Sequence, residues 1–174
     1  MRTEEITTGP RVPPDRDRPS QFWLTVLGDA AGAHWVLETR RMAFSSGQAA
    51  RALTIRPGDV LFLYTSRGAF NNPTRDEAQL IGLSRILTPV ARLRKPVVIA
   101  DREFVIGCRL QIELALPLRG GVPFRPLVRR MQFIPRKDIW GAYMRPSLIR
   151  LGPRDAQVLR EALQRTATRA PEPL

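Results

Sequence analysis

A tight turn followed by a run of apolar residues gives the clearest pattern in the chain. Within the turn, Pro57 presets its φ angle, Gly58 tolerates positive φ, and Asp59 can accept hydrogen bonds from nearby backbone amides. Residues 60–63 are apolar on both faces, which predicts a strand covered on both sides or lining a closed barrel. Residues 64–67 (Tyr-Thr-Ser-Arg) are expected to emerge together at one end of it. An aromatic ring, two hydroxyls and a guanidinium at the open end of a small barrel suit a planar, hydrogen-bonding ligand such as a base. The alternative is an ordinary core strand that ends in polar residues.

Three further segments have the pattern of strands. Residues 21–27 are rich in apolar side chains, and residues 78–87 are expected to return beside the turn strand, with Gly82 at a bulge or a close approach. Residues 104–116 alternate between apolar and polar positions, which predicts a long strand with one face in the core. Gly107 offers this strand a place to bend.

The connecting segments are less regular. The glycines, asparagines and proline of residues 28–32 and 66–77 predict loops. Two short extended pieces are expected at residues 34–37 and 131–134.

Helical patterns are few, and the confident one closes the chain. Short helices are expected at residues 48–53 and 123–130. The last helix begins at Pro153, a residue favoured at the first helical position, and Asp155 lies in its first turn. Its apolar stripe consists of Leu159, Ala162 and Leu163. Together these elements predict a small α+β domain, a partly closed β-barrel of five to six strands with a C-terminal helix and one or two short helices.

The 174 residues predict one domain with two tails. Residues 1–19 are rich in proline, arginine and aspartate without an apolar period, which predicts a flexible arm, and residues 166–174 predict a flexible tail. The folded domain is expected at residues 20–165. No apolar stretch approaches the roughly 20 residues that a membrane span needs, the N-terminus lacks a secretory pattern, and there is one cysteine. A cytoplasmic location is the expectation.

The net charge of +12 is unevenly distributed along the chain. Residues 85–150 contain 14 basic and four acidic residues, and therefore hold +10 of the total. A surface of this kind attracts phosphate backbones with salt-sensitive affinity. Because 26 of the 28 basic residues are arginine, which compositional bias alone can produce, a solvated basic face is the alternative to nucleic-acid binding.

The order of the motifs resembles that of the EVE domain. The similarity covers about residues 20–165. EVE domains belong to the PUA-like superfamily, alongside YTH and ASCH domains. The motifs that carry the resemblance are Phe22-Trp23-Leu24, Trp35, the Pro57-Gly58-Asp59 turn with Phe62-Leu63-Tyr64-Thr65-Ser66 after it, Ile81-Gly82, and the closing segment from Arg145-Pro146-Ser147 to Leu151.

This resemblance implies a concave pocket that accepts a modified base without catalysis. Trp35 resembles the aromatic wall after the first strand, and Tyr64-Thr65-Ser66 resembles the polar end of the strand that follows the turn. Arg145 and Ser147 resemble the segment that closes the pocket before the last helix.

A flipped base would be held by stacking and by hydrogen bonds to its Watson-Crick edge. Stacking on an aromatic ring contributes roughly 1 to 3 kcal/mol per base. The candidate rings are Trp35, Tyr64 and Trp140, with core positions the alternative for the two tryptophans, whereas Trp23 is expected in the core. The predicted phosphate-binding residues are Arg40, Arg67, Arg129 and Arg130, with Arg145 as a further candidate.

Catalysis is not expected. One histidine, His34, leaves no basis for a histidine metal cluster, and Cys108 lies on the apolar face of the long strand, where thiols are usually inert. The acidic residues are dispersed and there is no Gly-rich phosphate loop. We therefore expect no catalytic residue, metal or cofactor.

Two functions follow from these observations. The first is a domain that binds nucleic acid, DNA or RNA, and reads a modified or flipped base; any effector activity would come from another protein. The alternative is a small-molecule-sensing or protein-interaction barrel that binds a free nucleoside or another planar metabolite.

Overall fold

A computed structural model describes residues 18–169. Of the predicted N-terminal arm, only Arg18 and Pro19 fall within this range, and residues 170–174 of the predicted tail lie outside it. None of the helices in this part of the chain has the length and apolar character that crossing a membrane requires.

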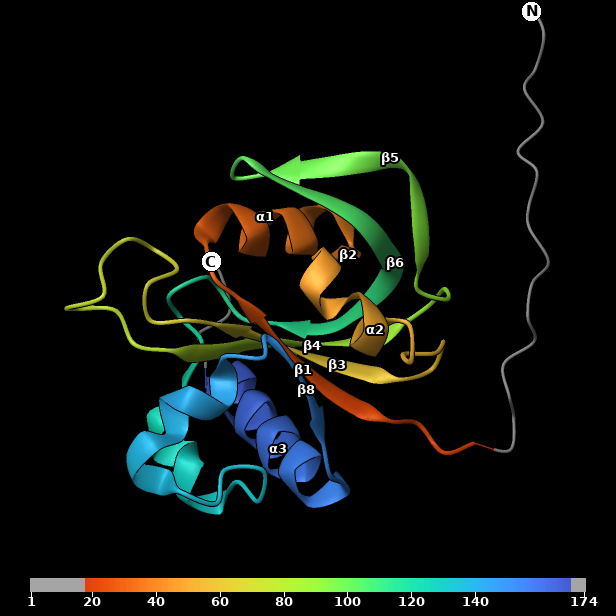
Figure 1. Ribbon diagram of the computed structural model, residues 1–174. Helices are drawn as coiled ribbons and strands as arrows, with labels where there is room; N and C mark the ends of the chain where they lie inside the picture. The colour runs from red at the N-terminus through yellow and green to blue at the C-terminus, as the bar shows by residue number, and fades with distance from the viewer. Residues whose placement is uncertain (1–17, 170–174) are drawn as a thin grey trace, which may run out of the picture.

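A curled, mixed β-sheet forms the centre of the molecule (Figure 1). In the order β2-β6-β4-β3-β1-β8, the strands are Arg41–Phe44, Arg102–Ala115, Gln79–Ile86, Val60–Thr65, Phe22–Leu27 and Leu148–Leu151; β5 is Ala91–Ile99 and β7 is Val122–Pro123. β5 pairs with β6, and β7 pairs with β4. β1 and β3 are parallel, and all other strand pairs are antiparallel.

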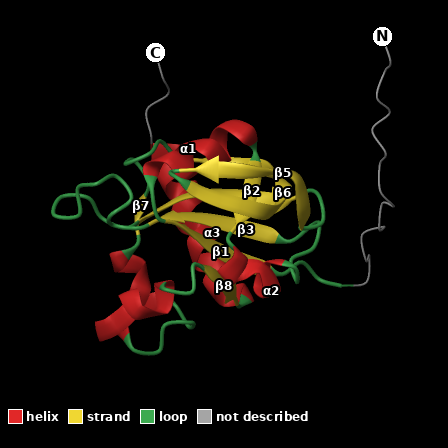
Figure 2. Cartoon of the chain, turned by 45° about the horizontal axis from the view of Figure 1, so that its top comes forward, coloured by secondary structure: helices red, strands yellow, loops and turns green. Residues whose placement is uncertain are grey.

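Helices cover both faces of this sheet (Figures 1 and 2). On one face lie α1 (Ala30–Thr39) and α2 (Ala49–Ala52), the latter preceded by the 3-10 helix η1 (Ser46–Gln48). On the other lie α3 (Pro153–Arg169) and the 3-10 helices η2 (Arg125–Arg130) and η3 (Lys137–Met144). The predicted α+β class with a C-terminal helix is therefore confirmed.

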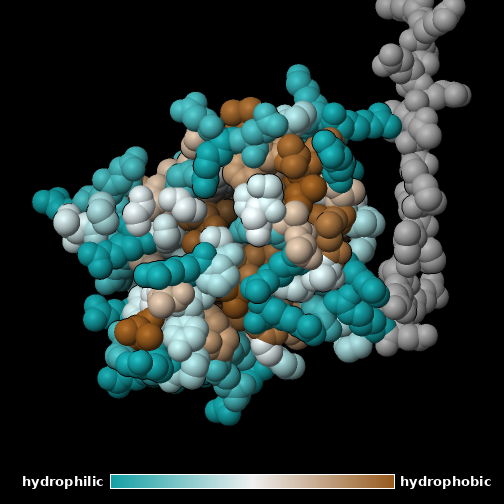
Figure 3. All heavy atoms as spheres, viewed as in Figure 1, coloured by the Kyte–Doolittle hydropathy of each residue, from teal (hydrophilic) through white to brown (hydrophobic). Residues whose placement is uncertain are grey.

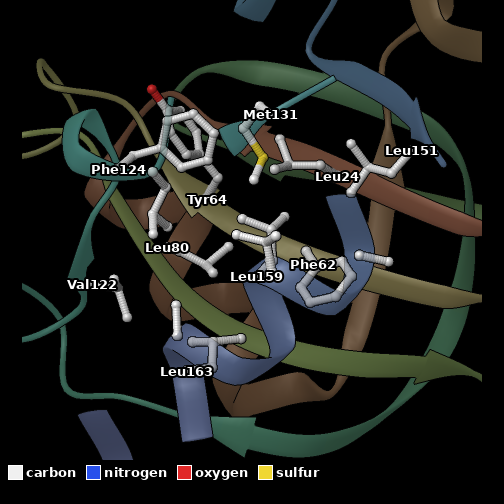
Figure 4. Packing of buried hydrophobic residues seen from close by; sticks show 14 of the residues in the cluster. Leu24, Phe62, Tyr64, Leu80, Val122, Phe124, Met131, Leu151, Leu159 and Leu163 are labelled. Carbon is white, nitrogen blue, oxygen red and sulfur yellow. The ribbon is translucent and has the colours of Figure 1, made fainter. Parts of the chain in front are cut away.

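The alternation of side chains along β3 divides the core into two parts. Phe62 and Tyr64 pack on the α3 side, where Figure 4 shows them among the side chains of Leu159 and Leu163. Residues 61 and 63, both leucine, pack on the opposite side with α1 and α2. The prediction of a strand covered on both faces is thus correct, and the sheet separates two hydrophobic layers.

The predicted turn before β3 is present and is fixed by one carboxylate. Gly58 has a φ of 90°, and the buried Asp59 carboxylate accepts hydrogen bonds from the backbone amides of Gln21 and Arg56, at 2.9 and 3.0 Å. It also accepts one from Trp23 Nε1 at 3.3 Å. These bonds tie the start of β1 to the start of β3.

Two glycines allow strands to approach closely. A Cβ atom on Gly82 would lie 2.9 Å from the Leu114 carbonyl oxygen, and the β4–β6 register shifts after Leu83. Gly107 pairs with both β2 and β5, and a Cβ atom there would clash with the Met42 carbonyl oxygen. Gly82 therefore has the close approach and the nearby bulge that the sequence predicts, whereas Gly107, predicted as a place to bend, allows a close approach of β2.

Residues 30–39 form a helix, so the predictions of a loop at 28–32 and an extended piece at 34–37 are wrong. The Asp29 side chain caps the helix by accepting a hydrogen bond from the Gly32 amide at 2.6 Å. At the other end, Arg40 adopts the left-handed conformation and donates its N–H to the Val36 carbonyl. The small residues after Asp29 suit a capped helix as well as a loop, and this capping signal was not recognised in the sequence.

Three other predictions need correction. Residues 131–134 form turns rather than a strand. Strands β2, β5, β7 and β8 were not predicted, and α3 continues through residues 166–169, which were assigned to the flexible tail. β5 escaped recognition because its polar and proline-containing sequence, mostly exposed at the edge of the sheet, lacks the alternation of a half-buried strand.

Candidate nucleic-acid interface

The predicted site residues do not form one pocket, because the sheet separates them. Trp35 packs with the layer under α1 and α2, whereas Tyr64 and Trp140 pack with the layer under α3. Trp35 and Ser147 line one hollow, and Tyr64 and Arg145 line another. The expectation that Trp35, Tyr64 and Arg145 converge on one cavity is therefore wrong.

The first hollow, which we call the β1–α1 cavity, has a volume of about 160 Å³. This is below the roughly 300 to 1,000 Å³ of sites for drug-sized ligands, and suits a single small, flat group. Its principal lining residues are Thr25, Trp35, Ser45, Gln48, Phe104 and Ser147. They come from β1, α1, the η1 turn, β6 and the segment before β8.

Two aromatic rings line this cavity. Trp35 is half-buried on α1, and the guanidinium of Arg41 lies over its ring at 5.5 Å from the centroid. Phe104, on β6, is covered in the same way by Arg102 at 5.7 Å. Cation–π contacts of this kind orient the rings and place positive charge beside them. Trp35 thus lines a cavity, and it lies on a helix rather than on the predicted extended piece.

The Thr25 hydroxyl is the unusual group of the cavity. Thr25 is fully buried, and among residues 18–169 its Oγ1 is the one buried side-chain N or O atom without a hydrogen-bond partner. A buried hydroxyl without a partner costs roughly 1 to 3 kcal/mol. Thr25 lines the cavity, but its Oγ1 exposes almost no surface, so a ligand can bond to this hydroxyl only after a small shift of the cavity wall.

Polar groups surround the rest of the cavity. The Gln48 side-chain oxygen accepts hydrogen bonds from the Ser45 amide and hydroxyl, at 3.1 and 3.2 Å. The Asp29 carboxylate accepts a hydrogen bond from Arg102 at 3.0 Å, which joins the start of α1 to β6. The cavity therefore offers hydroxyl, amide and guanidinium groups around an aromatic interior.

The second hollow, the β3–η3 groove, is larger and more open, with a volume of about 1,050 Å³. Tyr64 lies at its base and meets Phe124 edge-on, with ring centroids 5.0 Å apart (Figure 4). Trp140 packs on the same phenylalanine at 5.7 Å. Burial raises the pKa of the Tyr64 hydroxyl well above its usual value. The groove is lined by the predicted residues Tyr64, Ser66, Arg67, Trp140 and Arg145, and also by Arg75, Arg125 and the acidic residues Asp76, Glu77 and Asp138.

Thr65 belongs to neither hollow. It is fully buried, and its hydroxyl donates a hydrogen bond to the Gln79 carbonyl at 3.5 Å. Successive residues of a strand face opposite sides, so Tyr64 and Thr65 cannot both point to the same mouth. The prediction that Tyr64, Thr65 and Ser66 act together is wrong for this reason.

The predicted phosphate-binding arginines are dispersed over the molecule. Arg40 is exposed at the end of α1, and Arg67 lies in the groove, where its Nε donates to the Pro73 carbonyl. Arg129 and Arg130 line a third hollow beside α3. Figure 3, in the view of Figure 1, shows mostly hydrophilic residues around the margin of the molecule and hydrophobic residues near its middle.

Sequence reasoning missed several residues of the β1–α1 cavity, notably Thr25, Phe104 and Arg102. A signal for Thr25 exists, since it is the single hydroxyl in the apolar strand Phe22–Leu27. Phe104 was predicted on the apolar face of β6, and the alternation of apolar and polar residues does not distinguish a side chain that lines a cavity from one in the core.

Cys108 is buried on β6, and burial raises its thiol pKa to about 12. His34 is exposed on α1. Within residues 18–169, no group of three or more histidine, cysteine, aspartate or glutamate side chains is placed to hold a metal ion.

We predict that a thiol-specific disulfide reagent at pH 8 will not modify Cys108 in the folded protein and will modify it fully in urea. The reactive species is the thiolate, which a raised pKa suppresses, and burial also blocks access. Absorbance of the released reagent thiol measures the reaction. Rapid modification without urea would contradict the buried placement of Cys108 and would mean that β6 opens.

The fold resembles solved YTH domains. The Mmi1 YTH domain aligns with a TM-score of 0.54 and 9% identity over 87% of this chain and 79% of that one. The Mmi1 YTH domain in complex with RNA aligns with a TM-score of 0.52 and 9% identity over 86% and 80%. Human THYN1 in complex with 5-methylcytosine-containing DNA aligns with a TM-score of 0.45 and 14% identity over 82% of this chain and 98% of that one. No family model and no curated protein matches the chain.

Proposed function

Because the chain has the PUA-like fold of a YTH domain, we propose that it is a nucleic-acid-binding domain that holds one flipped base, without catalysing a reaction. The base would occupy the β1–α1 cavity. The β3–η3 groove, with its arginines, would contact the flanking strand. This assignment replaces the single pocket predicted from the sequence.

The unpartnered Thr25 hydroxyl is the observation that carries the proposal. A group that lowers stability in the free protein is explained if a ligand satisfies it. Nucleobases present N–H and C=O groups at their edges, and either could bond to a hydroxyl, which both donates and accepts. The aromatic rings of Trp35 and Phe104 in the same cavity provide surfaces for stacking.

The energies are consistent with base flipping. Extruding a base costs a few kcal/mol, and least when the base is already single-stranded. Stacking at roughly 1 to 3 kcal/mol per base, together with hydrogen bonds to the base edge, offsets this cost. Single-stranded or locally unpaired nucleic acid is therefore the preferred substrate.

The two hollows adjoin each other, which allows them to bind one strand together. Val26 lines both, and its N–H donates to the Ser147 carbonyl at 2.8 Å. Arg145, two residues before Ser147, lines the groove. A base in the cavity would thus lie on one side of the backbone at Val26, and the arginines of the groove would lie on the other side. The net charge of +12 favours binding of the phosphate backbone.

Binding to a fluorescent single-stranded oligonucleotide at 50 and 200 mM salt tests the proposal. We expect the affinity, measured by anisotropy, to fall by about tenfold between these salt concentrations, as for a protein that neutralises two to three phosphates. Free nucleosides serve as competitors that lack the backbone. Absence of oligonucleotide binding at 50 mM salt would contradict the proposal.

The second candidate function, capture of a free nucleoside or planar metabolite, uses the same cavity. The volume of about 160 Å³ suits one small group, and neither candidate requires a flanking nucleotide inside the cavity. Salt-independent binding of nucleosides, with no binding of oligonucleotides, would favour this candidate over the first.

A further inference from the structure

Four basic side chains surround a third hollow, the η2–α3 cavity, which has a volume of about 350 Å³. Arg129 and Arg130 come from the end of η2, Lys137 from the start of η3, and Arg154 from the first turn of α3. Figures 1 and 2 show the short helices that precede β8 beside α3, on the side of the sheet away from α1. Three separate segments thus bring positive charge to one place.

No acidic partner neutralises this cluster within residues 18–169. None of its four cations forms an ion pair there, and all four side chains are exposed. Lys137 donates a hydrogen bond to the Met131 carbonyl at 2.5 Å, which holds its ammonium group at the cavity. Like charges gathered in this way repel one another, so an anion between them would stabilise the folded protein.

The acid that follows Arg154 in the sequence, Asp155, is engaged elsewhere. It is buried, and its carboxylate accepts hydrogen bonds from the amides of Gln132 and Phe133, at 2.6 and 2.9 Å. These bonds fix residues 131–134 against the start of α3 and so shape the cavity.

We propose that the η2–α3 cavity binds a phosphoryl group. Guanidinium groups bind phosphate oxygens through paired hydrogen bonds, and the four cations more than offset the charge of a phosphate dianion or of two adjacent phosphodiesters. The phosphoryl group could belong to a nucleic-acid backbone or to free phosphate. The site is separate from the β1–α1 cavity, and the inference does not require that a base binds there.

Thermal unfolding of the full chain in sodium phosphate, with sodium chloride at matched ionic strength as the reference, tests the proposal. We expect 10 mM inorganic phosphate to raise Tm by about 4 °C, as for a ligand at about ten times its Kd. The double variant R129Q/R154Q should lose this rise. The matched control R165Q/R169Q removes two exposed arginines from the far end of α3 and should retain it.

The salt dependence of oligonucleotide binding distinguishes the two sources of phosphate. If R129Q/R154Q also lowers the slope of log K against log salt by about 0.7 to 1.4, the cavity holds backbone phosphates. If the slope stays unchanged while the Tm rise is lost, the cavity holds free phosphate. An equal rise of Tm in R129Q/R154Q and in the control, with circular dichroism showing both folded, would overturn the proposal.

Discussion

Thr25→Val should weaken nucleic-acid binding by about 30-fold and raise the free energy of unfolding by about 1 kcal/mol. Valine has nearly the shape of threonine and suits a strand, so the change removes the hydroxyl and little else. In the free protein this hydroxyl is buried without a partner, and its removal relieves an unfavourable burial. In the complex, its removal leaves a polar atom of the base unpaired. Anisotropy and urea denaturation measure the two effects.

Thr65→Val is the matched control for this prediction. Thr65 is as buried as Thr25 and lies on the neighbouring strand, but its hydroxyl already bonds to the Gln79 carbonyl. Its replacement should leave binding unchanged and should not stabilise the protein. If Thr25→Val bound the oligonucleotide as tightly as the unmodified protein, the base would not occupy the β1–α1 cavity.

Asp59→Ala should lower the free energy of unfolding by about 4 kcal/mol. The substitution leaves the amides of Gln21 and Arg56 and the indole N–H of Trp23 without their acceptor. It also removes the partner of Arg18, whose guanidinium lies 3.3 Å from the carboxylate. Because these bonds join β1 to the turn before β3, the whole centre of the sheet depends on them. Urea denaturation followed by tryptophan fluorescence measures the loss.

Asp138→Ala provides the comparison, since Asp138 pairs with Arg136 at 2.8 Å on the surface. An exposed ion pair contributes at most about 1 kcal/mol, so this variant should unfold nearly as the unmodified protein does. Equal stabilities of the two variants would mean that the Asp59 carboxylate does not hold β1 and the turn together.

The turn and the strands around it could be predicted because their signals are local. Pro57, Gly58 and Asp59 specify the turn within three residues, and the apolar run after them requires cover on both faces. The period of two in β6 likewise depends on neighbouring residues alone. Each of these predictions needed no knowledge of what lies opposite in space.

The candidate site could not be predicted in the same way, since it depends on which side of the sheet each residue faces. The sequence places Trp35 and Tyr64 near strand ends, but the capped helix α1 and the alternation of β3 direct them to opposite layers. The prediction that the consecutive residues Tyr64, Thr65 and Ser66 line one pocket did not take this alternation into account. Thr25 was visible as a lone hydroxyl in β1, although only the packing around it reveals that it lacks a partner.

The separation of the core into two layers by the sheet also bears on how this protein can change in evolution. Substitutions in the β1–α1 cavity and in the β3–η3 groove alter side chains on opposite faces, so their effects on stability are expected to be nearly additive. Val26 and the short link to Ser147 are the exceptions, because they border both hollows. The side chains of the two hollows could therefore change independently during evolution, with that link as the constraint they share.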